Sequence, residues 1–200
     1  MIRATLREWW REEALDDLAV SERKRLALKL LAESYSEDKL AGVLLLGEHL
    51  LPEVNADDLP SFAAAFSSGH ISDWNVCDWF SVKVLAALVE RNGRPMAEAI
   101  AGWRTAEPLW QRRAAAVALA PLAPKGEENF EGFVEVAVTV AEANARDPER
   151  FLQTSVGWLV RELSKGQPGV VREFVADHAD LLSREARRMA LAKLEGRGRR

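Results

Sequence analysis

The chain has 200 residues and a formal net charge of −4, with 48% hydrophobic and 29% charged residues. This balance is typical of a globular protein with one sizeable core. Its apolar runs are shorter than the roughly 18 residues of a membrane helix, so no membrane span is expected. The first residues are charged and lack the apolar stretch of a secretory signal. The single Cys77 cannot form an internal disulfide, which fits a cytoplasmic protein.

Charge is distributed unevenly along the chain. The segment 151–200 contains ten Lys and Arg against six Asp and Glu, a balance of +4, so the remaining residues carry −8. A polarised charge distribution allows one face to hold a duplex although the whole chain is acidic. The alternative is a solvated basic tail, and for the last residues, from about 195 to 200, we favour a flexible tail.

Helical periodicity dominates the chain, because good helix formers fill most segments and strictly alternating Val, Ile and Thr runs are missing. At residues 147–149, Asp147 is expected to be an N-cap, with Pro148 as the first helical residue. Some ten helices therefore form a single domain over residues 1–200, with no room for a linker. Short breaks separate these helices at residues 52–60, 67–69, 92–95, 107–108, 124–126, 147–149 and 166–168.

Several helical segments resemble one another. When Leu109–Ala123 and Arg150–Ser164 are compared at an offset of 41 positions, Trp110 falls on Phe151 and Arg112 on Gln153. A period near 40 residues is typical of stacked helix pairs. The small residues in the middle of these helices, Ala114, Ala115, Ala116 and Gly157, would allow neighbouring helices to approach closely. The alternative is that Ala-rich helices resemble one another by composition. We predict an all-α fold, an α-α superhelix of HEAT-like repeats.

No familiar metal or phosphate site is evident. His49, His70 and His178 each stand alone in their segments, and Cys77 has no partner at ligand spacing. Glycine-rich phosphate loops and nucleophile elbows are missing. We expect neither a metal nor a cofactor.

Trp74 and Asp78 are four residues apart and therefore share one helix face. The apolar stripe of the same segment, Val76, Phe80, Val84 and Leu88, follows a different face. If that stripe faces the core, Trp74 and Asp78 point away from it, and an exposed Trp beside a carboxylate contributes little to stability. The alternative is a core tryptophan and a solvated or capping aspartate, which periodicity alone favours.

Two further segments carry candidate residues. Arg112 and Arg113 are adjacent in an apolar helix and point about 100° apart, so that one can reach the inner surface of a repeat. The alternative is a surface salt bridge. Trp158 lies in a Gly-Trp-Leu-Val-Arg-Glu segment, where a core role is the ordinary interpretation.

Taken together, these segments resemble the AlkD-like DNA alkylation-repair glycosylases, a family of HEAT-like repeat proteins. The resemblance covers about residues 3–194. It is carried by Asp38–Leu51, Ser72–Trp79, Leu109–Leu119 and Phe151–Lys165.

The resemblance implies a role for each matching residue. The family's Trp and the catalytic Asp four residues later fall on Trp74 and Asp78. Its Arg in a Trp-x-x-Arg-Ala-Ala segment falls on Arg113, which would hold a phosphate near the lesion. Its second active-site Trp falls on Trp158. Further expected DNA contacts are Arg112, Lys83 and Arg161.

Relatives begin with one or two extra helices before a segment like the one at Ile2. Those helices help to line the DNA groove of the family, and here they are expected to be missing. An end repeat without its cap exposes apolar surface. We therefore expect Leu6, Trp9 and Trp10 to be partly exposed or to contact another chain.

The implied function is that of a base-excision-repair glycosylase. It would be a monomer that binds double-stranded DNA and hydrolyses the N-glycosidic bond of cationic N3- or N7-alkylated purines, without a membrane or a metal as partner. Two alternatives stay open. One is a non-catalytic DNA-binding paralogue, and the other is a HEAT-repeat scaffold for protein interactions.

Overall fold

The computed structural model describes residues 2–195, so residues 196–200 of the expected basic tail lie outside the described part. Within residues 2–195 the chain forms twelve α-helices and no strand. The all-α prediction is therefore confirmed. The number of helices exceeds ten partly because a π-helical turn divides one continuous helix, residues 74–92, into three elements. No helix within the same residues is both long and apolar enough to cross a membrane.

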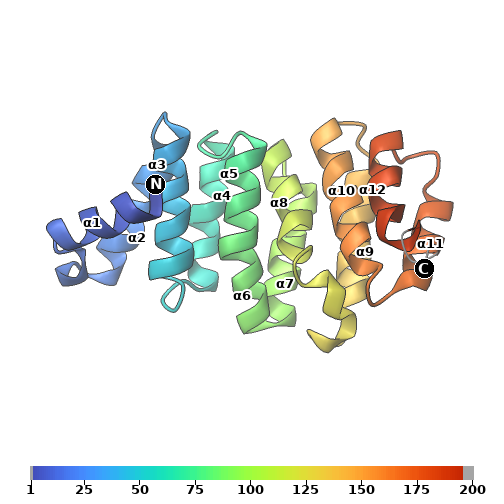
Figure 1. The fold of residues 1–200 in the computed structure, drawn as a ribbon, viewed down its shortest axis with the longest axis horizontal. Helices are drawn as coiled ribbons and strands as arrows, with labels where there is room; N and C mark the ends of the chain where they lie inside the picture. The colour runs from blue at the N-terminus through green and yellow to red at the C-terminus, as the bar shows by residue number, and fades with distance from the viewer. Residues whose placement is uncertain (1, 196–200) are drawn as a thin grey trace. The chain divides into compact units, whose positions relative to one another are not determined.

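Two compact units divide the chain, Met1–Leu88 and Val89–Arg200. In the first unit α1, α3 and α5 form one row, with α1 and α5 both packed on α3, and α2 and α4 form a second row (Figure 1). Its elements are α1 (Ile2–Glu12), η1 (Leu15–Asp17), α2 (Val20–Ala32), α3 (Ser36–Leu44), the π-helical turn η2 (Leu45–His49), η3 (Ala56–Asp58), α4 (Leu59–Ser67), α5 (Trp74–Phe80), the π-helical turn η4 (Ser81–Leu85) and α6 (Ala86–Asn92), which crosses the boundary.

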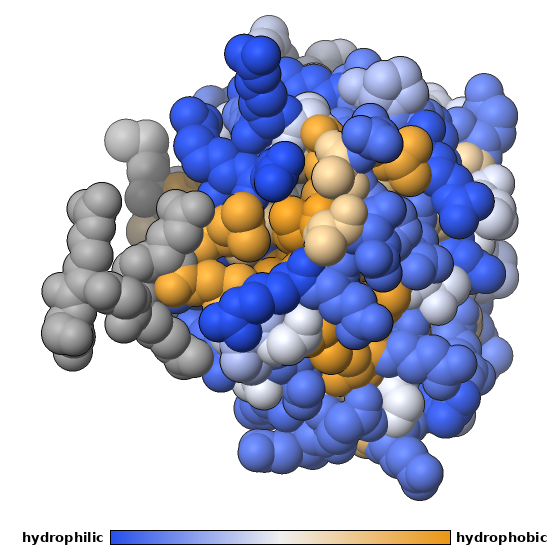
Figure 2. Space-filling model, turned by 90° about the vertical axis from the view of Figure 1, so that its right-hand side faces the viewer, coloured by the Kyte–Doolittle hydropathy of each residue, from blue (hydrophilic) through white to orange (hydrophobic). Residues whose placement is uncertain are grey.

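The second unit repeats the same two-row plan. Helices α8, α10 and α12 pack side by side in one row, and α9 packs against α7, α8 and α10 from the other (Figure 1). Its elements are α7 (Arg94–Ala101), η5 (Gly102–Thr105), α8 (Leu109–Leu119), η6 (Ala123–Glu128), α9 (Phe133–Ala145), α10 (Arg150–Leu163), α11 (Pro168–Asp177) and α12 (Arg184–Glu195). At the end that carries α11 and α12, most of the surface is hydrophilic and apolar surface gathers in a central band (Figure 2).

The apolar stripe predicted for residues 74–92 is the core face of the first unit. Val76, Phe80, Val84 and Leu88 are all 0% exposed. Phe80 meets Phe62 edge to face, with ring centroids 5.2 Å apart, an arrangement that aromatic rings prefer. Because this face is buried, the opposite side of α5 is directed away from the core.

The prediction that the first helix exposes its apolar face is wrong for two of its three residues. Leu6 is 5% exposed and Trp10 is 7% exposed, whereas Trp9 is half-buried. Trp10 is covered within its own unit: its ring stacks on His49 at 4.7 Å, and the Arg23 guanidinium lies 5.9 Å from the ring centroid. The side chains of His49 and Arg23 therefore bury the Trp10 ring, and the helical pattern of the sequence alone does not predict these contacts.

The 41-residue offset appears directly as contacts between α8 and α10. The rings of Trp110 and Phe151, which the offset aligns, lie 4.8 Å apart. Arg113 donates a hydrogen bond from Nη1 to Oγ1 of Thr154, at 3.1 Å and the same separation along the chain. Residues at equivalent repeat positions therefore stack on one another, as a repeat requires.

The break at residues 147–149 is present, but its expected cap is wrong. Helix α10 begins at Arg150 and its N-cap is Glu149, whose side chain accepts a hydrogen bond from the amide of Phe151. Asp147 instead accepts from the amide of Glu149 at 2.8 Å and from Arg112. These bonds hold Asp147 in the loop, so the helix starts later than the Asp-Pro pair indicates.

Gly157 allows α12 to lie against α10, as its small size predicts. A Cβ at this position would lie 2.9 Å from both the Ala186 carbonyl oxygen and the Met189 Cβ. Because the first of these atoms belongs to backbone, a side chain would force the helices apart.

Gly157→Ala should lower the free energy of unfolding measured with urea. Overpacking costs about 1–3 kcal/mol, which outweighs the roughly 1 kcal/mol by which alanine improves helix propensity. Gly169→Ala in α11 is the matched control, because nothing lies within 4 Å of its Cβ position, and this variant should be slightly stabilised. A Gly157→Ala variant as stable as the Gly169→Ala variant would contradict the close packing.

Candidate functional site

Trp74 and Asp78 lie on the outward side of α5. Asp73 caps the helix, because its Oδ1 accepts hydrogen bonds from the amides of Asn75 at 2.8 Å and Val76 at 3.0 Å. Trp74 follows as the first helical residue and is 56% exposed, which is unusual for so large an apolar side chain. Asp78 is half-buried one turn later. The Asp73 cap thus fixes where α5 begins, so that the exposed indole of Trp74 lies at the N-terminal end of the helix. The carboxylate of Asp78 lies on the same face, one turn later.

A π-helical turn follows directly after this pair. In η4 the amide of Ala86 donates to the carbonyl of Ser81, and the Ser81 hydroxyl donates to the Cys77 carbonyl at 2.7 Å. Lys83 lies in this turn, with its side chain 40% exposed. Single π-helical turns inside α-helices are frequent at functional sites, and this one places Lys83 beyond Asp78 along the outward side.

Lys83 belongs to a cluster around Trp79 and Glu48. The guanidinium of Arg3 donates twice to Glu48, from Nη2 at 2.7 Å and from Nε at 3.0 Å, and lies 5.4 Å from the Trp79 ring centroid. The ammonium of Lys83 lies 6.0 Å from the same ring and 3.9 Å from Glu48. Hydrogen bonding from Arg3 lowers the pKa of Glu48. The cluster places two cations and one carboxylate beside the α5 face.

In the second unit, one side of α10 carries the other predicted residues. Phe151, Thr154, Trp158 and Arg161 are half-buried at helical spacing, whereas Leu152, Val156 and Leu159 between them are 0% exposed. Arg161 is 32% exposed at its side chain and pairs with Glu162 at 3.1 Å. Trp158 therefore lies on a partly open side of the helix, between two polar residues.

Arg113 is 5% exposed, and its Nη1 donates to the Phe151 carbonyl at 2.5 Å as well as to Thr154. A buried guanidinium requires such bonds, because an unpaired buried charge is costly. Arg113 thus holds the first turn of α10, the helix that carries Trp158. Arg112 points elsewhere, as expected for its neighbour, and pairs with Asp147 at 2.8 Å.

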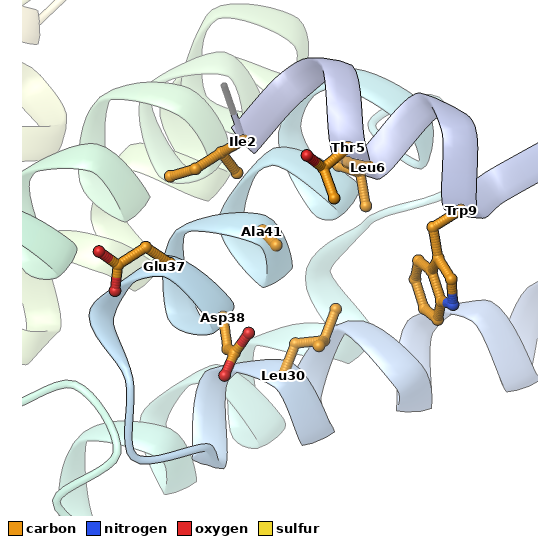
Figure 3. Close-up of a pocket in the computed structure, with 8 residues that line it drawn as sticks. All are labelled: Ile2, Thr5, Leu6, Trp9, Leu30, Glu37, Asp38 and Ala41. Atoms are coloured by element: carbon orange, nitrogen blue, oxygen red, sulfur yellow. The ribbon is translucent and has the colours of Figure 1, made fainter.

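A concave pocket of about 360 Å³ lies elsewhere in the first unit, between α1, α2 and α3 (Figure 3). It is lined by Ile2, Thr5, Leu6, Trp9, Leu30, Glu37, Asp38 and Ala41. None of the predicted site residues belongs to this lining. Apart from the buried Arg113, the predicted residues lie instead on helix surfaces, which suits contact with a large ligand better than enclosure of a small one.

Clustered metal ligands are missing from the described part of the chain. Across residues 2–195, no group of three or more His, Cys, Asp or Glu side chains is placed to hold a metal ion.

The structure adds contacts that the sequence patterns missed, and with them the residues Trp79, Arg3 and Glu48. Trp79 and Lys83 are four residues apart, so their contact could have been expected from helical spacing. Arg3 and Glu48 are 45 residues apart, and only the packing of α1 beside η2 joins them. The bond of Arg113 to Thr154 could have been expected from the repeat offset of 41.

Comparison with known proteins gives a consistent result. The family model described as "DNA alkylation repair enzyme" matches residues 1–194. A solved structure described as "Predicted DNA alkylation repair enzyme from Enterococcus faecalis" is similar with a TM-score of 0.79 and 17% sequence identity. The similarity covers 95% of this chain and 83% of that one, and at this identity it establishes the fold. No curated protein sequence matches the chain.

Arg113→Met should lower the free energy of unfolding by about 1–3 kcal/mol, because it removes the buried hydrogen bonds to Phe151 and Thr154. Arg112→Met is the matched control, since its ion pair with Asp147 is more exposed and should contribute about 0–1 kcal/mol. Urea unfolding of both variants measures the difference. Equal decreases in the free energy of unfolding for the two variants would show that the hydrogen bonds from Arg113 to α10 do not contribute more than the ion pair of Arg112.

The ion pair of Glu48 should make stability pH-dependent. Because Arg3 lowers the pKa of Glu48, the stabilisation is complete above the ordinary pKa of glutamate and is lost as the pH falls through the lower folded value. Thermal unfolding of Glu48→Gln should therefore show a deficit at neutral pH that closes in acid.

Glu8→Gln, in the same helix as Arg3, is the control because it also removes one carboxylate. The difference in melting temperature between this variant and the unmodified protein should vary less with pH than the difference for Glu48→Gln. A Glu48→Gln deficit that persists unchanged in acid would contradict the ion-pair account.

Proposed function

The chain belongs to the DNA alkylation repair enzyme family, and we propose that it is a DNA glycosylase that hydrolyses the N-glycosidic bond of cationic N3- or N7-alkylated purines in duplex DNA. The observation that carries the proposal is the pairing of an exposed indole, Trp74, with the half-buried carboxylate of Asp78 one helical turn later.

Hydrolysis of this N-glycosidic bond does not require a strong general acid. An alkylated purine such as N7-methylguanine is already cationic, so it leaves as a neutral base when the C1′–N bond breaks and takes the bonding electron pair with it. Positive charge then develops on the deoxyribose. A carboxylate beside that sugar stabilises the charge and can accept a proton from the water whose oxygen bonds to C1′. We assign this role to Asp78.

The face of a tryptophan ring can also stabilise the positive charge that develops on the deoxyribose. The negative face of an indole attracts a cation through its ring quadrupole, so Trp74 would stabilise the positive charge on the sugar and contact the backbone near the lesion. The family resemblance assigns the same role to Trp158. Exposure supports this assignment for Trp74, because 56% of its surface is available to a ligand.

The cations would hold the phosphates of the backbone. Lys83 and Arg161 have side chains that are 40% and 32% exposed, so they can reach a ligand. Arg112 would share its guanidinium with Asp147. The phosphate contact that the resemblance assigns to Arg113 stays a prediction, and its 5% exposure favours a positioning role beside Trp158.

Asp78→Asn should abolish release of 7-methylguanine from methylated duplex DNA, because the amide cannot stabilise positive charge on the sugar or accept a proton. Its melting temperature should stay near that of the unmodified protein. Base release is measured by chromatography of the free base. Asp73→Asn is the matched control: the substitution is the same, and asparagine still caps the helix, so activity should persist.

Full activity of Asp78→Asn would overturn the assignment of the catalytic carboxylate. If the unmodified protein binds duplex DNA without releasing any base, a non-catalytic DNA-binding protein replaces the glycosylase. If it shows no affinity for duplex DNA even at low salt, a scaffold for protein interactions replaces both.

A further inference from the structure

The pocket between α1, α2 and α3 in the first unit has no part in the proposed reaction (Figure 3). Helices α1 and α2 both pack on α3. The contact of α2 is close, because a Cβ on Gly42 would lie 2.7 Å from the Ala27 carbonyl oxygen. Between α1 and α2, helix α3 presents only the methyl group of Ala41. This small side chain leaves room for a pocket of about 360 Å³.

The walls of the pocket are apolar and partly open to solvent. Ile2, Leu6 and Trp9 follow one another at helical spacing on α1, and Leu30 faces them from α2 (Figure 3). Leu6 is buried, whereas Ile2, Trp9 and Leu30 are half-buried. Contact between water and these apolar side chains is unfavourable, so a ligand with an apolar body would be favoured here. The pocket volume also falls within the range of about 300–1,000 Å³ that is typical of small-molecule sites.

One end of the pocket carries two negative charges. Glu37 and Asp38 lie in the first turn of α3 and both line the pocket, with Asp38 half-buried and Glu37 exposed. Within residues 2–195, neither carboxylate forms an ion pair or a hydrogen bond. The lining contains no Lys, Arg or His. The local charge of the pocket is therefore −2, which a cationic ligand would compensate.

Helix stability explains only part of this arrangement. Carboxylates in the first turn of a helix interact favourably with the helix dipole, but that interaction does not require an apolar pocket beside them. The two charges would also repel phosphate, so the pocket is unsuited to the DNA backbone. Apolar walls with carboxylates at one end instead match a molecule that is apolar along its body and cationic at its tip.

We propose that this pocket binds a small organic cation of the arylalkylammonium class. The ammonium group would donate charge-assisted hydrogen bonds to Asp38, with Glu37 adding to the attraction from the outer edge of the pocket. The aromatic body would lie against Leu30 and pair with the half-buried ring of Trp9. The proposal goes beyond the proposed function, because none of these residues belongs to those assigned to base release.

Calorimetric titration of the full chain with phenylethylammonium tests the proposal. Two ligands of similar shape are the controls, because phenylethanol is neutral and phenylpropionate is anionic. The cation should bind about tenfold more tightly than the alcohol, since a hydrogen bond to a charged group contributes on the order of that factor. The anion should not bind detectably, because the two carboxylates repel it.

Two variants locate the binding in the pocket. Asp38→Asn keeps the size of the side chain and removes its charge, so it should weaken binding of phenylethylammonium about tenfold and leave binding of phenylethanol unchanged. Ala41→Leu fills the space between α1 and α2, and should weaken binding of both ligands.

Glu33→Gln is the matched control. Glu33 follows the last residue of α2 in the same unit, is exposed and does not line the pocket. The change in net charge is the same as in Asp38→Asn, so its affinity for phenylethylammonium should match that of the unmodified protein. Far-ultraviolet circular dichroism and melting temperature check that each variant is folded.

Each other outcome overturns the proposal. Equal affinity for phenylethylammonium and phenylethanol would show that the pocket does not select a cation, and absence of binding even at millimolar concentration would show that it is not a site for this class. An equal loss in Glu33→Gln would assign the effect to total charge. Binding of a lysine-rich peptide but not of phenylethylammonium, with a dependence on Asp38, would assign the pocket to a protein partner. Base release is not measured in these titrations, so all of these outcomes leave the proposed function intact.

Discussion

The buried guanidinium of Arg113 is the constraint on which the second unit depends. A cation that is 5% exposed must be hydrogen-bonded, and its partners, the Phe151 carbonyl and the Thr154 hydroxyl, lie in the first turn of α10. These bonds fix the register of α8 against α10. Because a helix is rigid, they also fix the direction in which the partly open side of α10 faces, and therefore where Trp158 lies.

Close backbone approach has the same effect in the first unit. A Cβ on Gly47 would lie 2.9 Å from the Lys83 carbonyl oxygen, so only glycine allows the π-helical turns η2 and η4 to lie together. Their contact brings Glu48 near Lys83 and the ring of Trp79. In both units, then, a feature without catalytic chemistry of its own determines where the charged and aromatic side chains are placed.

Much of the fold could be predicted from the sequence, because helical periodicity and a repeat of 41 residues are local or regular patterns. The same periodicity predicted the buried stripe of Val76 and Phe80, but its favoured interpretation of Trp74 as a core residue is wrong, because this side chain is 56% exposed. What could not be predicted depends on contacts between distant segments. The N-cap of α10 is Glu149 and not Asp147, because Asp147 accepts a hydrogen bond from Arg112. Trp10 is buried because His49 and Arg23 pack against its ring. The catalytic and DNA-binding roles depend on the family resemblance, since residue types and spacing alone favoured structural roles.

The net charge of −4 does not oppose a nucleic-acid ligand when the distances over which charges act are considered. At physiological ionic strength, exposed charges farther apart than about 8 Å are largely screened from one another. A phosphate near Arg3 and Lys83 therefore experiences the local balance of +1 that these two cations leave with Glu48 more strongly than it experiences acidic residues on distant surfaces. In the first unit, one partly buried carboxylate thus holds two cations close together, and so creates a basic surface on an acidic protein.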